Sequence, residues 1–589
     1  MSAIQTLLYS VEVGKARALV YFIPLLVTLF VVSAAYDVRV YRGLNDAQSM
    51  DNAQLARQIA QKSGFTTKFI RPYAVTQLHD YAATKSASLF PTDQFPAGTP
   101  RILPDTYNAP GYPYLLAGWL RLIPPRFDQA QDLMLNRHLY PGDVSIPWLN
   151  QILIILTAFF VFALGHSLFD NRVAWIASLA FLGSDLVWQY SITALSTNLL
   201  MLLITALLFV SVKIFCVAED HFVRDEPFWP TWIWAIALGF LLALACLTRL
   251  HLLVLLIPLL VFMGLMPRTN FLLLPFVAIM VIGLIAPWFW HTYKICGNPM
   301  GSNLPQLLYS ESGYSDNQIF CQTTIPSYEQ VLKEMSKKEL DGFSWHFDHI
   351  WYLLGANPFI LFWGACFLHR FKRIRANAFL WLIGGAAICI VAANNLGTPH
   401  PDVIDPWNTL IVLFPGMLVI GAAFFFILLD RMDLQLWMLN HAVIIIVMTV
   451  TVAPLAVSLS SKNNKYYNYP PYLPLVIEHI SDLTHPDEWV TSDMPWATAW
   501  YGDHASLWLP DSIKDFYHLH DNYCPTGILL LTPITLDAPM THLFSGEYRD
   551  WFPVFTGSNL PSEFPLTAHT NLVPQGIDYF VWSDSERWK

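Results

Sequence analysis

Residues 45–72 read NDAQSMDNAQLARQIAQKSGFTTKFIRP and carry two aspartates, Asp46 and Asp51. This polar segment directly follows an apolar run over residues 18–36, which is long enough to cross a membrane. The order of the two segments places carboxylates beside the surface of the bilayer. The question is what role acidic side chains have at the end of a transmembrane helix.

The composition points to a membrane protein. The chain has 589 residues, of which 54% are hydrophobic and only 13% are charged. A soluble domain carries nearer a quarter charged residues, so we predict an α-helical polytopic membrane protein. Its 22 tryptophans fit many helices that cross two membrane interfaces. The net charge of -10 argues against nucleic acid as a partner.

Eleven apolar runs are long enough to span about 30 Å of hydrocarbon. They cover residues 18–36, 147–168, 173–190, 195–213, 232–247, 251–266, 271–290, 349–369, 378–394, 408–428 and 436–457. Residues 112–123 are also apolar but too short to span, and they fit a helix that lies on the membrane surface. Residues 51–62 have helical spacing with few apolar side chains, which predicts a second interfacial helix.

Lysines and arginines in the short loops give the expected orientation. With the N-terminus inside, the cationic cluster HRFKRIR at residues 369–375 also falls inside. Two large loops, 37–146 and 291–348, then face outward together with the C-terminal residues 461–589. Because short β-like and helical runs alternate in residues 461–589, we predict a small extracytoplasmic α/β domain beside a membrane module of residues 1–460.

The seven cysteines show no metal-binding spacing such as CxxC. Cys296 and Cys321 both fall in the outward loop 291–348. The outer compartment is oxidising, so a disulfide between them is expected.

Polar groups that suit chemistry on a lipid-linked substrate gather at the expected outer mouth of the helices. Arg249 and His251 lie in LTRLH, residues 247–251, at an outward junction of two apolar runs where cations are disfavoured. A cation there, beside an apolar groove, suits a lipid-linked phosphate. A carboxylate opposite, Asp46 or Asp51, could take a proton from an attacking hydroxyl.

Each of these residues also has a purely structural interpretation. Asp46 or Asp51 could solvate a loop or cap the helix that begins near residue 52. Arg249 could pair with an acid between helices. Asp185 lies within an apolar run, where a charge is costly, so it is either a site residue or a buried hydrogen-bonding partner.

Three segments in order carry a family resemblance. They are MDNAQLARQIAQKSGFTT at residues 50–67, PDTYNAPGYPYLLAGWL at 104–120 and APWFWHTYKICGNPMGSN at 286–303. Together they resemble the GT-C membrane glycosyltransferases, and more narrowly the branch that contains dolichyl-phosphate-mannose protein mannosyltransferases and bacterial aminoarabinose transferases. The resemblance covers roughly the first 310 residues and implies a GT-C-like fold. Together with the apolar runs counted above, it predicts about 11 transmembrane helices plus interfacial helices.

The resemblance implies transfer of one sugar from a polyprenyl-phosphate donor to an acceptor outside the cytoplasm, with inversion at the anomeric carbon. The acceptor class, whether protein, lipid or glycan, stays open. The family's acid in the first outer loop acts as a base or positions the acceptor, and this role falls on Asp46 first and on Asp51 second. Residues 191–198 (SITALSTN) lack an acid that is common in relatives, so neither a cofactor nor a divalent metal is indicated.

The remaining site residues follow from this mechanism. Arg249 would stabilise the leaving phosphate. Its expected helpers are His251, Lys294 and Arg71. The expected substrate contacts are Tyr107, Asn108, Asp185 and His291, the last being a basic residue that follows the Pro-Trp pair of the third segment.

Two rival functions stay open. The first is a membrane transporter or channel, although deep charges and broken midplane helices are few in this sequence, Asp185 excepted. The second is a non-catalytic relative that binds lipid-linked sugar without transferring it. For the glycosyltransferase and for both rivals, we expect a multi-pass protein in the bacterial inner membrane, with the C-terminal domain in the periplasm.

Overall fold

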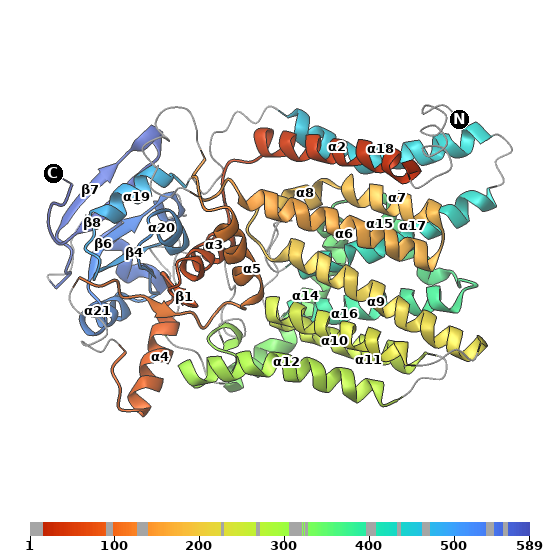
Figure 1. Ribbon diagram of the computed structural model, residues 1–589. Coiled ribbons are helices and arrows are strands. Elements are labelled where there is room, and N and C mark those ends of the chain that lie inside the picture. Colours follow the sequence, from red (N-terminus) through yellow and green to blue (C-terminus); the bar gives the residue numbers. More distant parts are fainter. Residues whose placement is uncertain are drawn as a thin grey trace.

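A bundle of apolar helices and a mixed sheet lie side by side in the computed structural model (Figure 1). The structure describes residues 16–89, 98–125, 139–224, 229–266, 271–305, 321, 323, 328–395, 408–432, 437–461, 472–536, 547–557 and 563–588. Most of the middle of the predicted loop 291–348, including residues 306–320, therefore lies outside the described residues.

Seven helices in the described part of the chain are long and apolar enough to cross a membrane. They are α6 (Ile146–Leu168), α9 (Thr197–Arg224), α10 (Pro230–Thr248), α12 (Leu273–Cys296), α16 (Ile374–Asn394), α17 (Phe414–Arg431) with the 3-10 turn η4 (Thr409–Leu413) before it, and α18 (Trp437–Ser460). These helices confirm the predicted helical membrane architecture.

The other four predicted spans fall on one further helix and three interrupted pairs. They are α2 (Ala16–Arg39), α7 (Asn171–Leu182) with α8 (Asp185–Ser191), the 3-10 helix η2 (Leu250–Leu255) with α11 (Leu256–Gly264), and the end of α14 (Tyr328–Leu353) with α15 (Pro358–Ala365). The last pair is broken because Gly355 and Ala356 have positive φ and Pro358 follows. The number of membrane crossings therefore stays a prediction.

The sheet has six strands in the order β2-β5-β4-β6-β8-β7. They are β2 (Phe69–Ile70), β5 (Ser506–Trp508), β4 (Trp489–Ser492), β6 (Thr526–Leu531), β8 (Tyr579–Ser583) and β7 (Ala568–Leu572). The first four are parallel, while β8 and β7 are antiparallel to their neighbours. Because β2 comes from the first predicted outer loop, that loop and the C-terminal residues share one sheet. The boundary at residue 461 and the extracytoplasmic location stay predictions.

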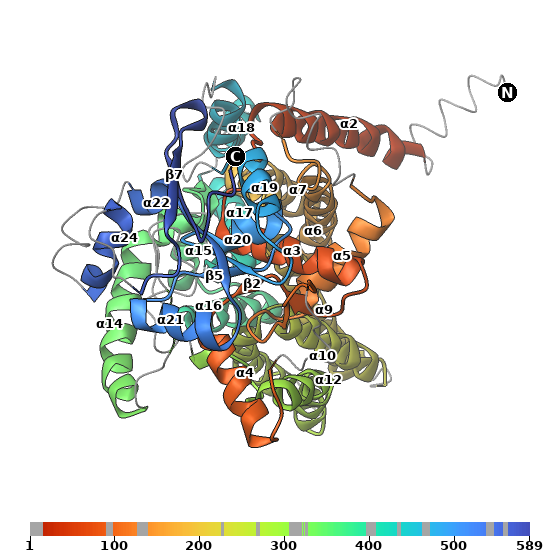
Figure 2. The ribbon, with the colours of Figure 1, turned by 90° about the vertical axis from the view of Figure 1, so that its left-hand side faces the viewer.

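Three helices of the first predicted loop lie where the bundle meets the sheet. They are α3 (Ala47–Ala60), α4 (Pro72–Thr84) and α5 (Gly111–Leu122), and α3 and α5 coincide with the two expected interfacial helices. Although α3 is polar, nearly all of it is buried, because it packs against α5 and against α20 (Pro495–Tyr501). Figure 2 views the molecule from the sheet side and shows α4 and α14 at its periphery.

A buried aspartate ties the bundle to the C-terminal residues. Asp143, just before α6, accepts hydrogen bonds from Trp500 Nε1 at 2.8 Å and from the Tyr501 hydroxyl at 3.1 Å. Burial raises the pKa of Asp143 to about 7, against the lowering effect of these donors. The junction at this end of α6 is therefore fixed by polar contacts as well as by apolar packing.

The expected disulfide is not present in the structure, where none of the seven cysteines, all of them described residues, takes part in a disulfide. Cys296 ends α12 and packs in a small apolar cluster with Leu78 and Leu103. Cys321 belongs to a different cluster, and its backbone forms an isolated parallel β-bridge with Pro510, beyond the end of β5. The prediction was wrong because membership of one loop does not bring two side chains together.

The contacts at the two ends of α6 show where reporter fusions would test the predicted orientation. Arg373, in the cationic cluster, donates to the carbonyl of Leu168 at one end of α6, whereas Asp143 and the sheet lie at the other end. The 23 residues of α6 span about 34 Å at 1.5 Å per residue, which is enough to cross the hydrocarbon. Reporter fusions at Arg375 and at the C-terminal Lys589 should therefore report opposite sides of the membrane. The same side for both would overturn the topology.

Candidate active site

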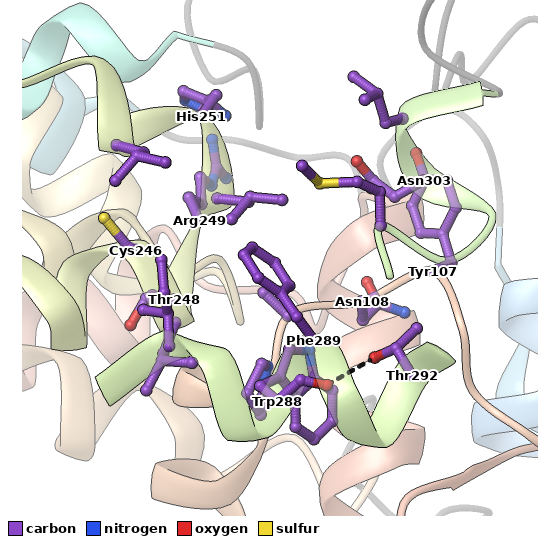
Figure 3. Close-up of a pocket in the computed structure, with 18 of the residues that line it drawn as sticks. Tyr107, Asn108, Cys246, Thr248, Arg249, His251, Trp288, Phe289, Thr292 and Asn303 are labelled. Carbon is purple, nitrogen blue, oxygen red and sulfur yellow. Dashed lines mark hydrogen bonds between the residues drawn. The ribbon is translucent and has the colours of Figure 1, made fainter. Parts of the chain in front are cut away.

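A cavity of about 270 Å³ lies where α10 ends. Its walls come from the residues before α5, the turn between α10 and α11, one face of α12 and the segment after α12 (Figure 3). Gln48 of α3 and Ala393 of α16 complete the lining, so residues from six separate parts of the chain meet at this cavity.

The break after α10 brings Arg249 into the wall. The helix ends at Thr248, and Arg249 adopts an extended conformation, with φ -148° and ψ 114°, before η2 begins. The start of α5 packs closely here, because a Cβ on Gly111 would lie 2.4 Å from Thr248 Oγ1. A glycine is therefore required at this point for α5 to approach α10.

Arg249 is 8% exposed and lines the cavity. Its Nε donates to Ser196 Oγ at 3.0 Å, and its Nη2 donates to Gln48 Oε1 at 3.4 Å. Next to it, His251 lines the same cavity and lies 3.3 Å from Thr409 Oγ1 through Nε2. A buried guanidinium at the wall of a largely apolar cavity suits an anionic group.

Asp46 caps α3, which begins at Ala47 rather than near residue 52. Its Oδ1 accepts from the backbone N–H of Ser49 at 2.7 Å. Its Oδ2 is buried and has no hydrogen-bond partner among the described residues. Burial raises the pKa of Asp46 to about 6, although the Ser49 contacts and the charge of Arg249 lower it. The structural interpretation therefore accounts for one oxygen of Asp46 but not for the other. Asp46 itself does not line the cavity, although Gln48, two residues further along α3, does.

Asp51 is fully buried and forms an ion pair with Arg71, whose Nη2 lies 2.9 Å from Asp51 Oδ2. Asp51 also accepts from Asn108 Nδ2 at 2.8 Å. The guanidinium of Arg71 lies 3.8 Å from the centre of the Tyr107 ring. Asp51 and Arg71 thus neutralise each other behind the cavity, and neither of them lines it.

Tyr107 and Asn108 both line the cavity. Asp105 holds Asn108 by accepting from its Nδ2 at 2.8 Å, and burial together with the charge of Asp51 raises the pKa of Asp105. Thr106 accepts from the backbone N–H of Ser302 at 3.0 Å. The bond between Thr106 and Ser302 fixes the loop before α5 to the segment after α12, and the bond from Asn108 to Asp105 orders the loop itself. The two substrate contacts expected there are therefore held in place.

That close packing needs a glycine at position 301. A Cβ on Gly301, which has φ 65°, would lie 2.0 Å from the carbonyl oxygen of Thr106. The GNPMGSN end of the third family-like segment is therefore a structural part of the site.

Three more of the predicted site residues, like Asp46, Asp51 and Arg71, do not line the cavity. His291 and Lys294 are exposed on other faces of α12, and Lys294 Nζ lies 5.3 Å from the centre of the Trp290 ring. Asp185 starts α8 and accepts from Ser458 Oγ and Gln189 Nε2, both at 2.7 Å. Asp185 thus joins α8 to α18, which matches its interpretation as a buried hydrogen-bonding partner.

Other lining residues were not expected from the sequence. They include Gln48, Trp288, Phe289, Thr292 and Asn303. A signal for two of them was present, since Trp288 and Thr292 are four residues apart and therefore share a face of α12. Within the described chain, no group of three or more His, Cys, Asp or Glu side chains could hold a metal ion.

Comparisons with known proteins give structural matches only. No family model and no curated protein matches the sequence. ArnT from Cupriavidus metallidurans bound to undecaprenyl phosphate has a TM-score of 0.52 and 13% identity, over 96% of this chain and 98% of ArnT. The apo oligosaccharyltransferase of Archaeoglobus fulgidus has a TM-score of 0.51 and 11% identity, over 95% of this chain and 74% of that one.

Such low identities establish the fold alone. Both solved proteins are GT-C membrane glycosyltransferases, and the first is an aminoarabinose transferase. The likeness covers nearly the whole chain, whereas the sequence resemblance covers only its first half. The chain is therefore an integral membrane protein with the fold of the GT-C glycosyltransferases.

Proposed function

We propose that this protein transfers a sugar from a polyprenyl-phosphate donor to an acceptor on the extracytoplasmic side of the membrane. The observation that carries the proposal is Arg249, a buried cation in the wall of a cavity at the end of an apolar helix. ArnT, which shares the fold, has been crystallised with undecaprenyl phosphate. A polyprenyl phosphate is thus the anion that best suits Arg249.

In the proposed reaction, the lipid phosphate is the leaving group. The guanidinium of Arg249 stabilises the charge that builds on the phosphate oxygen as the bond from that oxygen to the anomeric carbon breaks. His251 lies beside it in the cavity wall. The leaving phosphate needs charge stabilisation more than a proton, so a cation is the appropriate group.

Asp46 is the proposed base. The acceptor hydroxyl attacks the anomeric carbon from the face opposite the phosphate, and its proton passes to Asp46 Oδ2, which lacks a partner among the described residues. One new glycosidic bond forms and one sugar–phosphate bond breaks. The anomeric configuration inverts because the hydroxyl attacks from the face opposite the leaving phosphate in a single displacement. Polyprenyl phosphate and the glycosylated acceptor are the products.

The proposed sugar contacts are the lining residues with polar or aromatic side chains. Asn108 and Asn303 offer amides to sugar hydroxyls, and Trp288 offers a ring face on which a sugar can stack. Asp51 and Arg71 support the loop that carries Asn108 rather than contacting substrate. The proposed location is the bacterial inner membrane, with the C-terminal residues in the periplasm, and the proposed acceptor is a protein, a lipid or a glycan.

The pH dependence of turnover should follow the ionisation of the Asp46 carboxyl. With a pKa near 6, the carboxyl is mostly ionised at pH 7 and becomes protonated as the pH falls through 6. A protonated carboxyl cannot accept a proton, so kcat should fall about tenfold for each pH unit below the pKa. The pH profile of the Asp46→Asn protein should lack this acidic limb. An unchanged limb in that variant would assign it to another group.

Release of polyprenyl phosphate tests the function itself. Purified full-length protein would be given a panel of polyprenyl phosphates that carry labelled sugars, with and without extracts that supply acceptors. We expect acceptor-dependent release of polyprenyl phosphate for at least one donor. A transporter would release none, and a non-catalytic relative would bind donor without turnover. Either result would overturn the proposal.

A further inference from the structure

Gln48 contacts the proposed phosphate-binding arginine but has no part in the chemistry outlined above. It lies in the first turn of α3, two residues after Asp46, and lines the cavity. Its Oε1 accepts from Arg249 Nη2 at 3.4 Å, while Ser196 Oγ accepts from Arg249 Nε at 3.0 Å. Among the contacts of Arg249, two neutral oxygens from different parts of the chain therefore accept from two of its nitrogens, while the Asp46 carboxyl acts on it through its charge.

The same helix also carries a carboxylate that pairs with an arginine. Three residues further on, Asp51 forms a buried ion pair with Arg71 at 2.9 Å, and Arg71 does not line the cavity. An amide oxygen orients a guanidinium through a dipole, whereas a carboxylate also adds a full negative charge. At position 48 a carboxylate would compete with any anion for Arg249.

We propose that Gln48 is a positioning residue, which orients Arg249 at the cavity without adding negative charge and so favours binding of a polyprenyl phosphate there. This inference rests on the proposed function. The side chain at position 48 must be able to accept a hydrogen bond and must be neutral.

Three variants separate charge from packing. Gln48→Glu keeps the size and the acceptor but adds a charge, while Gln48→Met keeps the approximate length and removes the hydrogen bond. Gln61→Glu is the matched control, because Gln61 is the exposed C-cap residue of the same helix and does not line the cavity. It adds the same charge to α3 at a distance from Arg249.

The main readout is binding of undecaprenyl phosphate to the full-length protein in detergent, measured by its stabilisation against heating. Undecaprenol, which lacks the phosphate, reports binding of the lipid tail alone. We expect Gln48→Glu to weaken undecaprenyl phosphate binding roughly 10- to 100-fold, by analogy with the loss of one charge-assisted contact. Gln48→Met should weaken it less, and Gln61→Glu should leave it unchanged. Undecaprenol binding should be the same in all four proteins.

Turnover provides a second readout that a purely structural role would not give. In Gln48→Glu the KM for the donor should rise, while kcat at saturating donor should fall much less, because the added charge competes with the ground-state phosphate. Equal losses in Gln48→Met and Gln48→Glu would mean that the added charge does not matter at this position, which would overturn the role proposed for Gln48.

The failures of the two proposals differ. If wild-type protein binds undecaprenyl phosphate no better than undecaprenol, the proposed function fails and this inference fails with it. If wild-type protein discriminates the phosphate and Gln48→Glu binds it as tightly, only the role of Gln48 is overturned.

Discussion

The Asp46→Asn substitution is expected to lower turnover by roughly 100-fold or more, because an asparagine cannot take the proton of the acceptor hydroxyl. The amide keeps the size of the carboxyl, and its oxygen can still cap α3 through the N–H of Ser49. Binding of undecaprenyl phosphate should therefore change little. Steady-state release of polyprenyl phosphate and lipid-dependent thermal stabilisation, measured on the same preparation, check both parts.

Asp51→Asn is the comparison for that experiment. It leaves Arg71 buried without its carboxylate, which should cost about 3–5 kcal/mol of stability because a buried charge loses its partner. We expect a clear drop in Tm with a smaller loss of turnover per folded molecule. If Asp51→Asn folds normally and loses all turnover while Asp46→Asn stays active, Asp51 is the base.

The Arg249→Ala substitution should lower the rate of transfer strongly. It removes the guanidinium from the leaving phosphate, a loss on the order of 2–4 kcal/mol of transition-state stabilisation, or roughly 30- to 1000-fold in rate. Arg249→Lys should recover part of the rate, since it keeps the charge but loses the planar fork that contacts Ser196 and Gln48. Release of polyprenyl phosphate is the measurement.

Lys294→Ala is the matched control for the loss of a cation at this end of the bundle. Lys294 is exposed on α12 and does not line the cavity, so its removal should leave transfer near the wild-type rate. The assignment fails if Arg249→Ala is fully active, or if Lys294→Ala is the variant that loses transfer.

The sequence predicted the membrane part of the fold well, because a span must be apolar over its whole length. Breaks within spans were harder to predict. The extended backbone at Arg249 separates α10 from η2 without a glycine or proline at the junction. The strand β2 was also missed, since Phe69 and Ile70 pair with β5, more than 400 residues away, and a two-residue strand has no periodicity to recognise.

The site was predicted in part for similar reasons. Arg249, His251, Tyr107 and Asn108 were expected and do line one cavity, because each lies where an apolar run meets the outer loops. His291 was expected from its place after the Pro-Trp pair, yet the helical rotation of α12 turns it outward, while Trp288 and Thr292 face the cavity. Asp51 was considered with Asp46, but its pairing with Arg71 depends on tertiary contacts that spacing does not reveal.

A structure of the full-length protein with undecaprenyl phosphate tests the central claim most directly, namely that Arg249 binds the lipid-linked phosphate. We predict phosphate oxygens within hydrogen-bonding distance, about 2.7–3.2 Å, of the Arg249 guanidinium, inside the cavity lined by Asn108 and Trp288. A phosphate bound instead beside Lys294 on the outer face of α12, or a lipid that leaves this cavity empty, would contradict the account.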